Sequence, residues 1–124
     1  NDGDIDVLVG NITDSPDLLI NQTKGNHWLQ IDLVGGAGRA EVGTWSNRDG
    51  IGARITIKTP QSRQVKDLHS AASYQSANDL RVHFGLGTAE ACDVMVEWPS
   101  GRKSELERTA ANQLIVIDEM TGDK

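Results

Sequence analysis

Residues 28–34 read WLQIDLV, and this stretch decides the fold class because its side chains alternate in character. Leu29, Ile31 and Leu33 fall on one side of an extended chain, and Gln30 falls between them on the other. Strict alternation of this kind is typical of a β-strand with one buried face. We therefore expect a half-buried strand whose three apolar side chains point into the core.

Short apolar or alternating segments recur along the rest of the chain. They are residues 5–9, 18–20, 51–59, 64–68, 80–86, 93–98, 102–107 and 114–117. Turn residues separate them, and PSG at 99–101 lies between two alternating segments, which predicts a hairpin. Only residues 70–78 suggest a short helix, and their apolar spacing is poor. This pattern predicts an all-β fold, an antiparallel β-sandwich or partly open barrel of about eight short strands.

Composition supports one folded domain and excludes several partners. The net charge of −6 disfavours nucleic acid and anionic membrane surfaces. No apolar run approaches the roughly 20 residues that a membrane span needs, so we expect no membrane insertion. Leu, Ile, Val and Phe make up 29 of the 124 residues, above the share of about 20% below which disorder is expected.

The first six residues, NDGDID, have the character of a calcium-binding loop. Asp2, Asp4 and Asp6 alternate around a glycine, and Ca²⁺ takes about six to eight oxygen ligands. The simpler interpretation is a solvated acidic terminus. The start has neither Met nor a signal peptide, so we expect a piece of a longer protein. Calcium would then bind in the parent protein, and weakly or not at all in this chain.

Residues 46–53, SNRDGIGA, hold the densest group of polar and turn residues. Asn47, Arg48 and Asp49 can pin a tight loop through an arginine–carboxylate pair, or they can present polar groups to a ligand. We favour the structural interpretation and keep these three residues as ligand-binding candidates.

Two aromatic residues, Trp45 and Tyr74, are further ligand-binding candidates. Trp45 ends a loose loop, and an exposed indole beside polar groups is a natural platform for a sugar ring. Packing onto the sheet is the commoner fate of such a side chain. Trp98 alternates with Val94 and Val96, which predicts a core position.

Nothing in the sequence forms a catalytic motif, and we predict no catalytic residues. The three histidines show no spacing typical of zinc ligands, and no GxSxG motif is present. The single cysteine, Cys92, lies beside Asp93 and near Glu90, and negative neighbours raise the pKa of a thiol. We therefore expect an unreactive, partly buried Cys92.

Five short motifs resemble the ASPIC/UnbV domain family. They are residues 26–29 (NHWL), 46–53 (SNRDGIGA), 83–87 (HFGLG), 96–101 (VEWPSG) and 111–114 (ANQL). Residues 2–19 resemble the tail of an FG-GAP/VCBS repeat. Relative to the family, residues 36–45 are an insertion.

The resemblance implies a large secreted or cell-surface protein in which calcium-binding FG-GAP repeats form a β-propeller ahead of this domain. It implies calcium ligands at Asp2, at Asp6 and at the backbone of Asp4. It further implies a repeat tail and linker over residues 1–25, an ASPIC/UnbV-like β domain over 26–119 and a disordered tail over 120–124. The resemblance carries no established biochemical activity.

Three functions are consistent with these observations. The first is a noncatalytic extracellular module that binds protein or glycan at the cell surface. The second is a carbohydrate-binding module, which predicts Trp45 or Tyr74 exposed beside residues 47–49. The third is a hydrolase with paired carboxylates, for which Asp49, Asp79 and Glu97 are the candidates. We also expect that any exposed strand edge, above all at residues 5–9, favours a homodimer.

Overall fold

A computed structural model of the chain describes residues 4–22, 24–39, 45–73 and 76–122. These residues form nine strands in three sheets and no helix, which confirms the all-β prediction. Since they contain no helix, the described residues offer none that could cross a membrane. The strands are β1 (Val7–Val9), β2 (Asp17–Leu19), β3 (His27–Val34), β4 (Arg54–Lys58), β5 (Arg63–Asp67), β6 (Val82–Gly87), β7 (Ala91–Glu97), β8 (Lys103–Ala110) and β9 (Gln113–Asp118).

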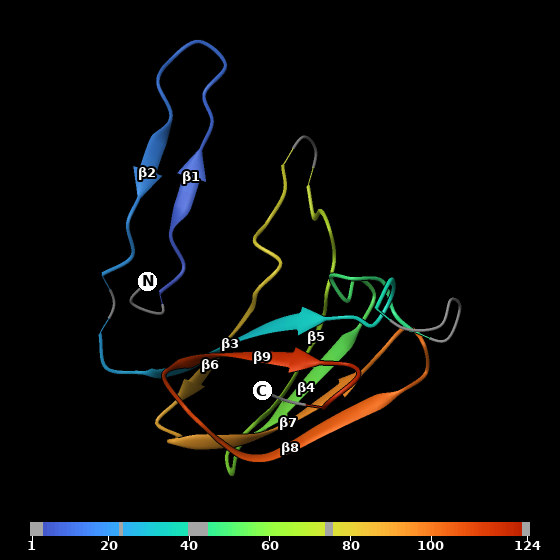
Figure 1. Cartoon of the computed structure of the whole chain (residues 1–124). Coiled ribbons are helices and arrows are strands. Elements are labelled where there is room, and N and C mark those ends of the chain that lie inside the picture. The colour runs from blue at the N-terminus through green and yellow to red at the C-terminus, as the bar shows by residue number, and fades with distance from the viewer. Residues whose placement is uncertain (1–3, 23, 40–44, 74–75, 123–124) are drawn as a thin grey trace.

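Two of the three sheets pack face to face as a sandwich (Figure 1). The first has the order β6-β3-β9, in which β3 runs antiparallel to β6 and parallel to β9. The second has the order β5-β4-β7-β8 and is antiparallel throughout. The architecture is therefore the sandwich of the two predicted alternatives, with one parallel pair, β3 and β9, where antiparallel pairing was expected.

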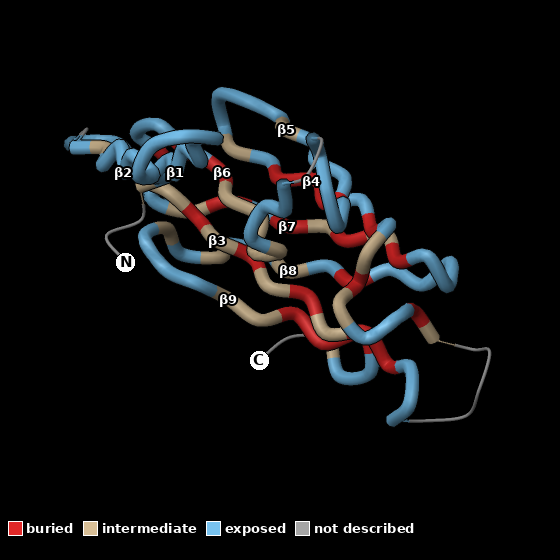
Figure 2. Tube along the Cα trace, turned by 90° about the horizontal axis from the view of Figure 1, so that it is seen from above, coloured by how far each residue is buried: buried red, intermediate tan, exposed pale blue. Residues whose placement is uncertain are grey.

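The core lies between these two sheets, where the buried residues gather (Figure 2). Leu29 and Ile31 of β3 are fully buried and Leu33 is 3% exposed, as the alternation predicts. The other large side chains that are essentially fully buried are Ile55, Ile57, Phe84, Val94, Val96 and Ile117. Because burial of each such side chain contributes about 1.5–3 kcal/mol, the contact between the sheets supplies the main stabilising free energy.

The predicted turn after β7 is confirmed in detail. The amide of Trp98 donates to the carbonyl of Arg102 (2.9 Å), and Gly101 takes a φ of 89° that favours glycine. The Trp98 indole is 3% exposed and donates a hydrogen bond of 2.9 Å to the hydroxyl of Ser104. Trp98 is therefore a core residue, as predicted.

Two local predictions differ from the structure. The strand predicted from residue 51 begins only at Arg54, because Ile51 belongs to the preceding turn. The helix suggested over residues 70–78 is wrong for its described part, where Ser73 and Ser76 form an isolated β-bridge. Serine and asparagine side chains compete for backbone hydrogen bonds, and this segment has no apolar face to repay helix formation.

Side chains of β5 close one edge of the sandwich. Gln64 donates from Nε2 to the carbonyl of Gly85 (2.6 Å), and Lys66 donates from Nζ to the carbonyl of His83 (2.6 Å). Both carbonyls belong to β6, which lies at the edge of its sheet. These contacts occupy backbone acceptors that would otherwise be free to pair with another strand.

The third sheet is a separate two-stranded hairpin. Strands β1 and β2 pair antiparallel only with each other, from Val7 opposite Leu19 to Val9 opposite Asp17. The hairpin stands beside the sandwich and joins it through the segment that leads into β3 (Figure 1).

Candidate functional site

The loop at residues 46–53 is held together by the side chain of Asn47. Its Nδ2 donates to the carbonyl of Ile51 (2.7 Å), and its Oδ1 accepts from the amide of Ile51 (2.9 Å). Gly50 has a φ of 64°, and a Cβ at that position would lie 2.8 Å from Cβ of Leu33. Both halves of the Asn47 amide are thus engaged within the loop, which fits the structural interpretation of this residue.

The predicted arginine–carboxylate pair is present, but it lies on the surface. Arg48 Nε is 3.0 Å from Asp49 Oδ1, and the Arg48 side chain is 80% exposed. The pair raises the pKa of Arg48 through the hydrogen bond to Asp49 and the charge of Asp49. Because an exposed pair contributes about 0–1 kcal/mol, Asn47 rather than Arg48 holds this loop.

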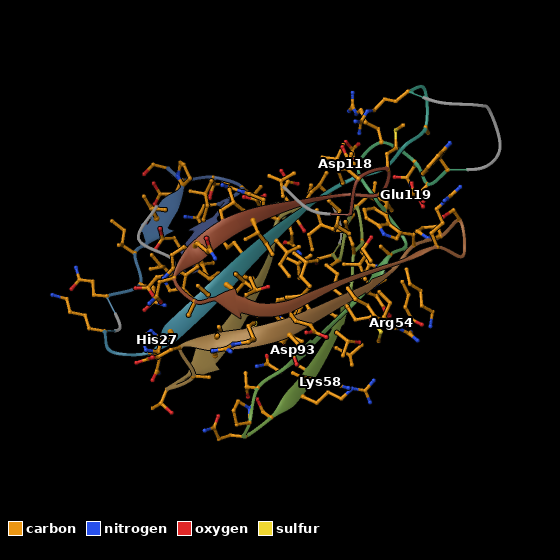
Figure 3. All side chains as sticks on the ribbon, turned by 60° about the horizontal axis from the view of Figure 1, so that its bottom comes forward. His27, Arg54, Lys58, Asp93, Asp118 and Glu119 are labelled. Atoms are coloured by element: carbon orange, nitrogen blue, oxygen red, sulfur yellow. The ribbon has the colours of Figure 1, made fainter. Side chains whose placement is uncertain are left out.

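A buried carboxylate, Glu119, draws three chain segments together directly after β9. Its Oε2 accepts from the amides of Gly36 (2.9 Å) and Ser46 (2.8 Å), and its Oε1 accepts from the hydroxyl of Ser46 (2.9 Å). The hydroxyl of Ser100, in the β7–β8 turn, also donates to Oε1. We call Gly36, Ser46, Ser100 and Glu119 the Glu119 cluster. Figure 3 places Glu119 and Asp118 together at one end of the sandwich and His27 at the other.

These hydrogen bonds keep Glu119 ionised. Burial raises the pKa of this carboxyl, but the hydrogen bonds from Ser100, Gly36 and Ser46 outweigh it and hold the pKa below its usual value. Beside it, Asp118 Oδ2 lies 2.7 Å from Arg39 Nη1. Four donors of the Glu119 cluster point at one carboxylate, and the amide of Ser100 also donates to the hydroxyl of Ser46 (3.2 Å), so the cluster holds the surrounding loops together.

Trp45 packs into the same end of the molecule. The guanidinium of Arg102 lies 3.9 Å from the ring centroid, a cation–π contact. Gly36 lies so close that a Cβ there would come within 2.7 Å of the indole. Trp45 is half-buried, and Arg102 occupies ring surface that a sugar would need.

Two predicted site residues, Asp2 and Tyr74, lie outside the described residues. Of the predicted calcium ligands that are described, Asp4 is half-buried, and Asp6 Oδ1 accepts a hydrogen bond from the amide of Asn21 (2.8 Å). Two carboxylates fall short of the about six to eight oxygens that Ca²⁺ requires. Across the described residues, no group of three or more His, Cys, Asp or Glu side chains forms a metal site.

The three carboxylates nominated for a hydrolase each have a cationic partner of their own. Asp49 pairs with Arg48, Asp79 pairs with Arg81, and Glu97 Oε1 lies 2.9 Å from Lys103 Nζ. The hydrogen bonds from Arg81 and Lys103 lower the pKa of Asp79 and Glu97, respectively. The structure thus places these carboxylates in separate ion pairs.

The motifs at residues 26–29 and 111–114 meet at the far end of the sandwich. Asn112 has a φ of 61°, and its backbone amide donates to the carbonyl of Trp28 (2.6 Å). Its side-chain Nδ2 lies 2.7 Å from Nδ1 of His27. Trp28 in turn stacks on His83, with ring centroids 6.3 Å apart. Both motifs therefore fasten the start of β3 to the start of β9.

Cys92 is buried more deeply than the partly buried position predicted for it, at 3% exposure. Its side chain is buried, and burial, followed by the charge of Asp93, raises the pKa of the thiol. A raised pKa keeps the sulfur protonated and weakly nucleophilic at neutral pH.

The most exposed apolar surface of the described chain lies on the β1–β2 hairpin and its flanks. Ile12 is fully exposed, Leu8 is 69% exposed and Ile20 is 62% exposed. The other large apolar side chains exposed there are Ile5, Val7, Val9, Leu18 and Leu19. We call these eight residues the hairpin patch. The pairs Val7–Leu19 and Leu8–Leu18 lie on opposite faces of the hairpin, so both faces expose apolar side chains. Exposed apolar surface of this extent is typical of an interaction site.

Comparison with known proteins gives one match. A family model described as ASPIC and UnbV matches residues 43–124, well over half of the chain. The match covers four of the five motifs quoted above, and residues 26–29 lie before it. No curated protein and no solved structure matches the chain.

Sequence reasoning missed the Glu119 cluster. Residues 36, 46, 100 and 119 are far apart in the chain, and neither strand periodicity nor a motif connects them. One indication was available, because an acidic pair at 118–119 directly follows an apolar strand that enters the core. A carboxylate in that position needs buried donors, and Ser46 and Ser100 both lie in predicted turns.

Proposed function

This chain belongs to the ASPIC and UnbV family, and on that premise we propose that it is a noncatalytic binding domain of an extracellular protein. In this proposal the domain binds another protein, and the preceding part of the parent protein is a calcium-binding β-propeller of FG-GAP/VCBS repeats. The single observation that carries the proposal is the hairpin patch.

The hairpin patch is available for docking because its side chains take no part in the core of the sandwich. The core between the two sheets is filled by residues from 29 onward, and the hairpin strands pair only with each other. A two-stranded hairpin alone is at best marginally stable in water. Eight exposed apolar side chains on such a hairpin favour burial against a further protein surface.

The hairpin sequence also favours this interpretation. VLV in β1 is an unbroken apolar run, and DLL in β2 has two adjacent leucines. Such runs are typical of strands covered on both faces, whereas strands with one wet face alternate. We therefore expect the bound partner to cover the hairpin on both of its faces.

The carbohydrate-binding alternative has less support. Asn47 uses its side-chain amide within its own loop, and the Trp45 ring carries the guanidinium of Arg102. A ligand at this end would have to displace contacts that hold the loops in place. A glycan array with the intact chain tests this alternative, and saturable binding would favour it.

Sedimentation velocity tests the docking role of the hairpin. In the absence of a partner, we expect the chain to self-associate as its concentration rises, and we expect Leu8→Ser with Leu18→Ser to abolish this. Leu114→Ser is the matched control, because Leu114 is an exposed leucine (44%) on β9, away from the hairpin. A chain that stays monomeric and binds no hydrophobic dye, or equal effects of the two variants, would contradict the proposal.

A further inference from the structure

The side chains on the outer face of the β5-β4-β7-β8 sheet form three rows that cross the strands, and the third row contains Arg63, Lys58 and Asp93. In one row, Asp67 pairs with Arg54 (2.7 Å) and Glu97 pairs with Lys103 (2.9 Å). This row is neutralised by its own ion pairs. The other two rows differ from it in a way that points to a ligand.

The central row is largely uncharged. Thr56 lies between Val65 of β5 and Met95 of β7, and Glu105 of β8 follows Met95. Val65 is 48% exposed and Met95 is half-buried. The sheet thus presents an apolar strip on the side that faces away from the core.

A groove of about 170 Å³ runs along this face beside the central row. Thr56 and Met95 line it together with four charged residues, Lys58, Asp93, Glu105 and Glu107. Lys58 and Asp93 lie near each other on this side of the sheet in Figure 3. None of the four forms an ion pair with the described residues, although Asp93 accepts the amide of Arg108 (3.0 Å).

Thr56 provides a second observation, independent of the carboxylates. Its side chain points away from the core because Ile55 and Ile57 on either side point inward, and it lines the groove. Thr56 is only 2% exposed and its hydroxyl makes no hydrogen bond with any described residue, but this hydroxyl is accessible from the groove, because no fully buried side-chain oxygen or nitrogen of the described residues lacks a partner. A nearly buried hydroxyl that faces a groove is placed to bond with a group that enters it.

The size and charge of the groove define what fits. Sites for drug-sized molecules have volumes of about 300–1,000 Å³, so this groove admits about one long side chain. Three carboxylates and one ammonium line the groove, and Arg63 of β5 lies opposite Lys58, so a small excess of negative charge remains. Met95 offers contact for methylene groups. A lysine or arginine side chain fits both features, because its aliphatic stem can contact Met95 and its cationic head can meet the carboxylates.

We propose that this face docks a basic segment of a partner protein, which places a lysine or arginine side chain in the groove over Thr56 and Met95. The apolar strip meets the backbone of the segment, and Glu105 and Glu107 meet the cationic head. This inference rests on the proposed role as a binding domain and assigns to it a second surface, distinct from the hairpin patch.

Titration of the full isotope-labelled chain with short peptides tests it by NMR. The peptides are acetylated and amidated pentapeptides of glycine whose central residue is arginine, lysine, norleucine or glutamate. We expect arginine and lysine peptides to shift amides of residues 56–58, 93–95 and 105–107, and the norleucine peptide to bind several-fold more weakly. The glutamate peptide should not bind. Shifts confined to the β1–β2 hairpin, which carries several aspartates, or no shifts at all would overturn the inference.

Matched variants separate the groove from bulk charge. Glu105→Gln with Glu107→Gln should lower the affinity for the arginine peptide by about five- to tenfold, since exposed ion pairs contribute modestly to binding. Glu90→Gln with Asp14→Asn removes the same charge elsewhere and should change affinity less than about twofold. Thr56→Val should weaken binding and Thr56→Ser should retain it. Equal losses in the two charge variants would overturn the inference. The hairpin experiment uses other residues, so failure here leaves the hairpin proposal standing.

Discussion

The sandwich and the β1–β2 hairpin contain the same kinds of apolar residue, but these side chains are buried in the sandwich and exposed in the hairpin. In β3, alternation buries Leu29, Ile31 and Leu33 almost completely. In the hairpin, an unbroken run leaves Val7, Leu8 and other apolar side chains exposed. Apolar content alone therefore does not create a core. A strand needs a second layer on each apolar face, and the described chain supplies that layer only to the sandwich.

Truncation of a large core side chain should have the largest effect on stability. Phe84→Ala should lower the free energy of unfolding by about 3–5 kcal/mol, because Phe84 is fully buried and truncation leaves a cavity. Chemical denaturation, followed by tryptophan fluorescence, measures the change. A loss below about 1 kcal/mol would mean that the two sheets are not packed as described.

The Glu119 cluster predicts the next largest effect. Glu119→Gln should cost about 1.5–3 kcal/mol at neutral pH, because a charged acceptor is lost and its donors stay buried. Equilibrium unfolding in urea measures this cost. Asp14→Asn on the hairpin is the matched control and should change stability little.

The same carboxylate predicts how stability depends on pH. The pKa of Glu119 is lower in the folded chain than its usual value of 4.5, so the folded state binds fewer protons. Its contribution is therefore present above about pH 4.5 and is lost as the pH falls through the folded pKa. Thermal unfolding between pH 7 and pH 3 should show a smaller acid-induced loss for Glu119→Gln than for the wild type. Parallel curves would contradict this assignment.

The contact between Trp45 and Arg102 predicts a smaller effect. Arg102→Ala should cost about 0.5–1 kcal/mol through loss of the cation–π contact. Arg102→Lys should recover part of that cost. Urea denaturation measures both variants, and tryptophan fluorescence should report greater exposure of the indole.

The hairpin predicts the smallest effect on folding. Leu8→Ser with Leu18→Ser should change the free energy of unfolding of the sandwich by less than about 0.5 kcal/mol, because neither side chain contributes to the core. Hydrogen exchange should give fast exchange in β1 and β2 and slow exchange in β3, β4 and β7. Strong protection of the hairpin in the monomeric chain would remove the contrast between the two regions.

The features that follow from local periodicity, namely strand positions and inward-facing residues, could be predicted from the sequence. Alternation located β3, β6 and β7, and it assigned inward-facing residues such as Ile31 and Val96. The turn at 99–101 followed from its residue types. Local pattern does not encode partner choice, so the parallel pairing of β3 with β9 was not foreseen.

The candidate sites were less predictable for the same physical reason. Alternation places Thr56 on the outer face, but only its neighbours on adjacent strands bury it to 2% exposure. Glu119 acquires its role because three loops reach it in space. Asn47 was named as a ligand candidate, and its engagement by Ile51 became visible only with the loop conformation.

The pairing of β3 with β9 also determines when the β6-β3-β9 sheet can be completed during synthesis. Leu29 pairs with Gln113 and Val34 pairs with Asp118, so β3 cannot pair fully until β9, the last of the described strands, has been synthesised. During that interval one edge of β3 has no neighbour, and such edges promote aggregation of nascent chains. A ribosome that stops before residue 113 would release a polypeptide unable to complete its central strand.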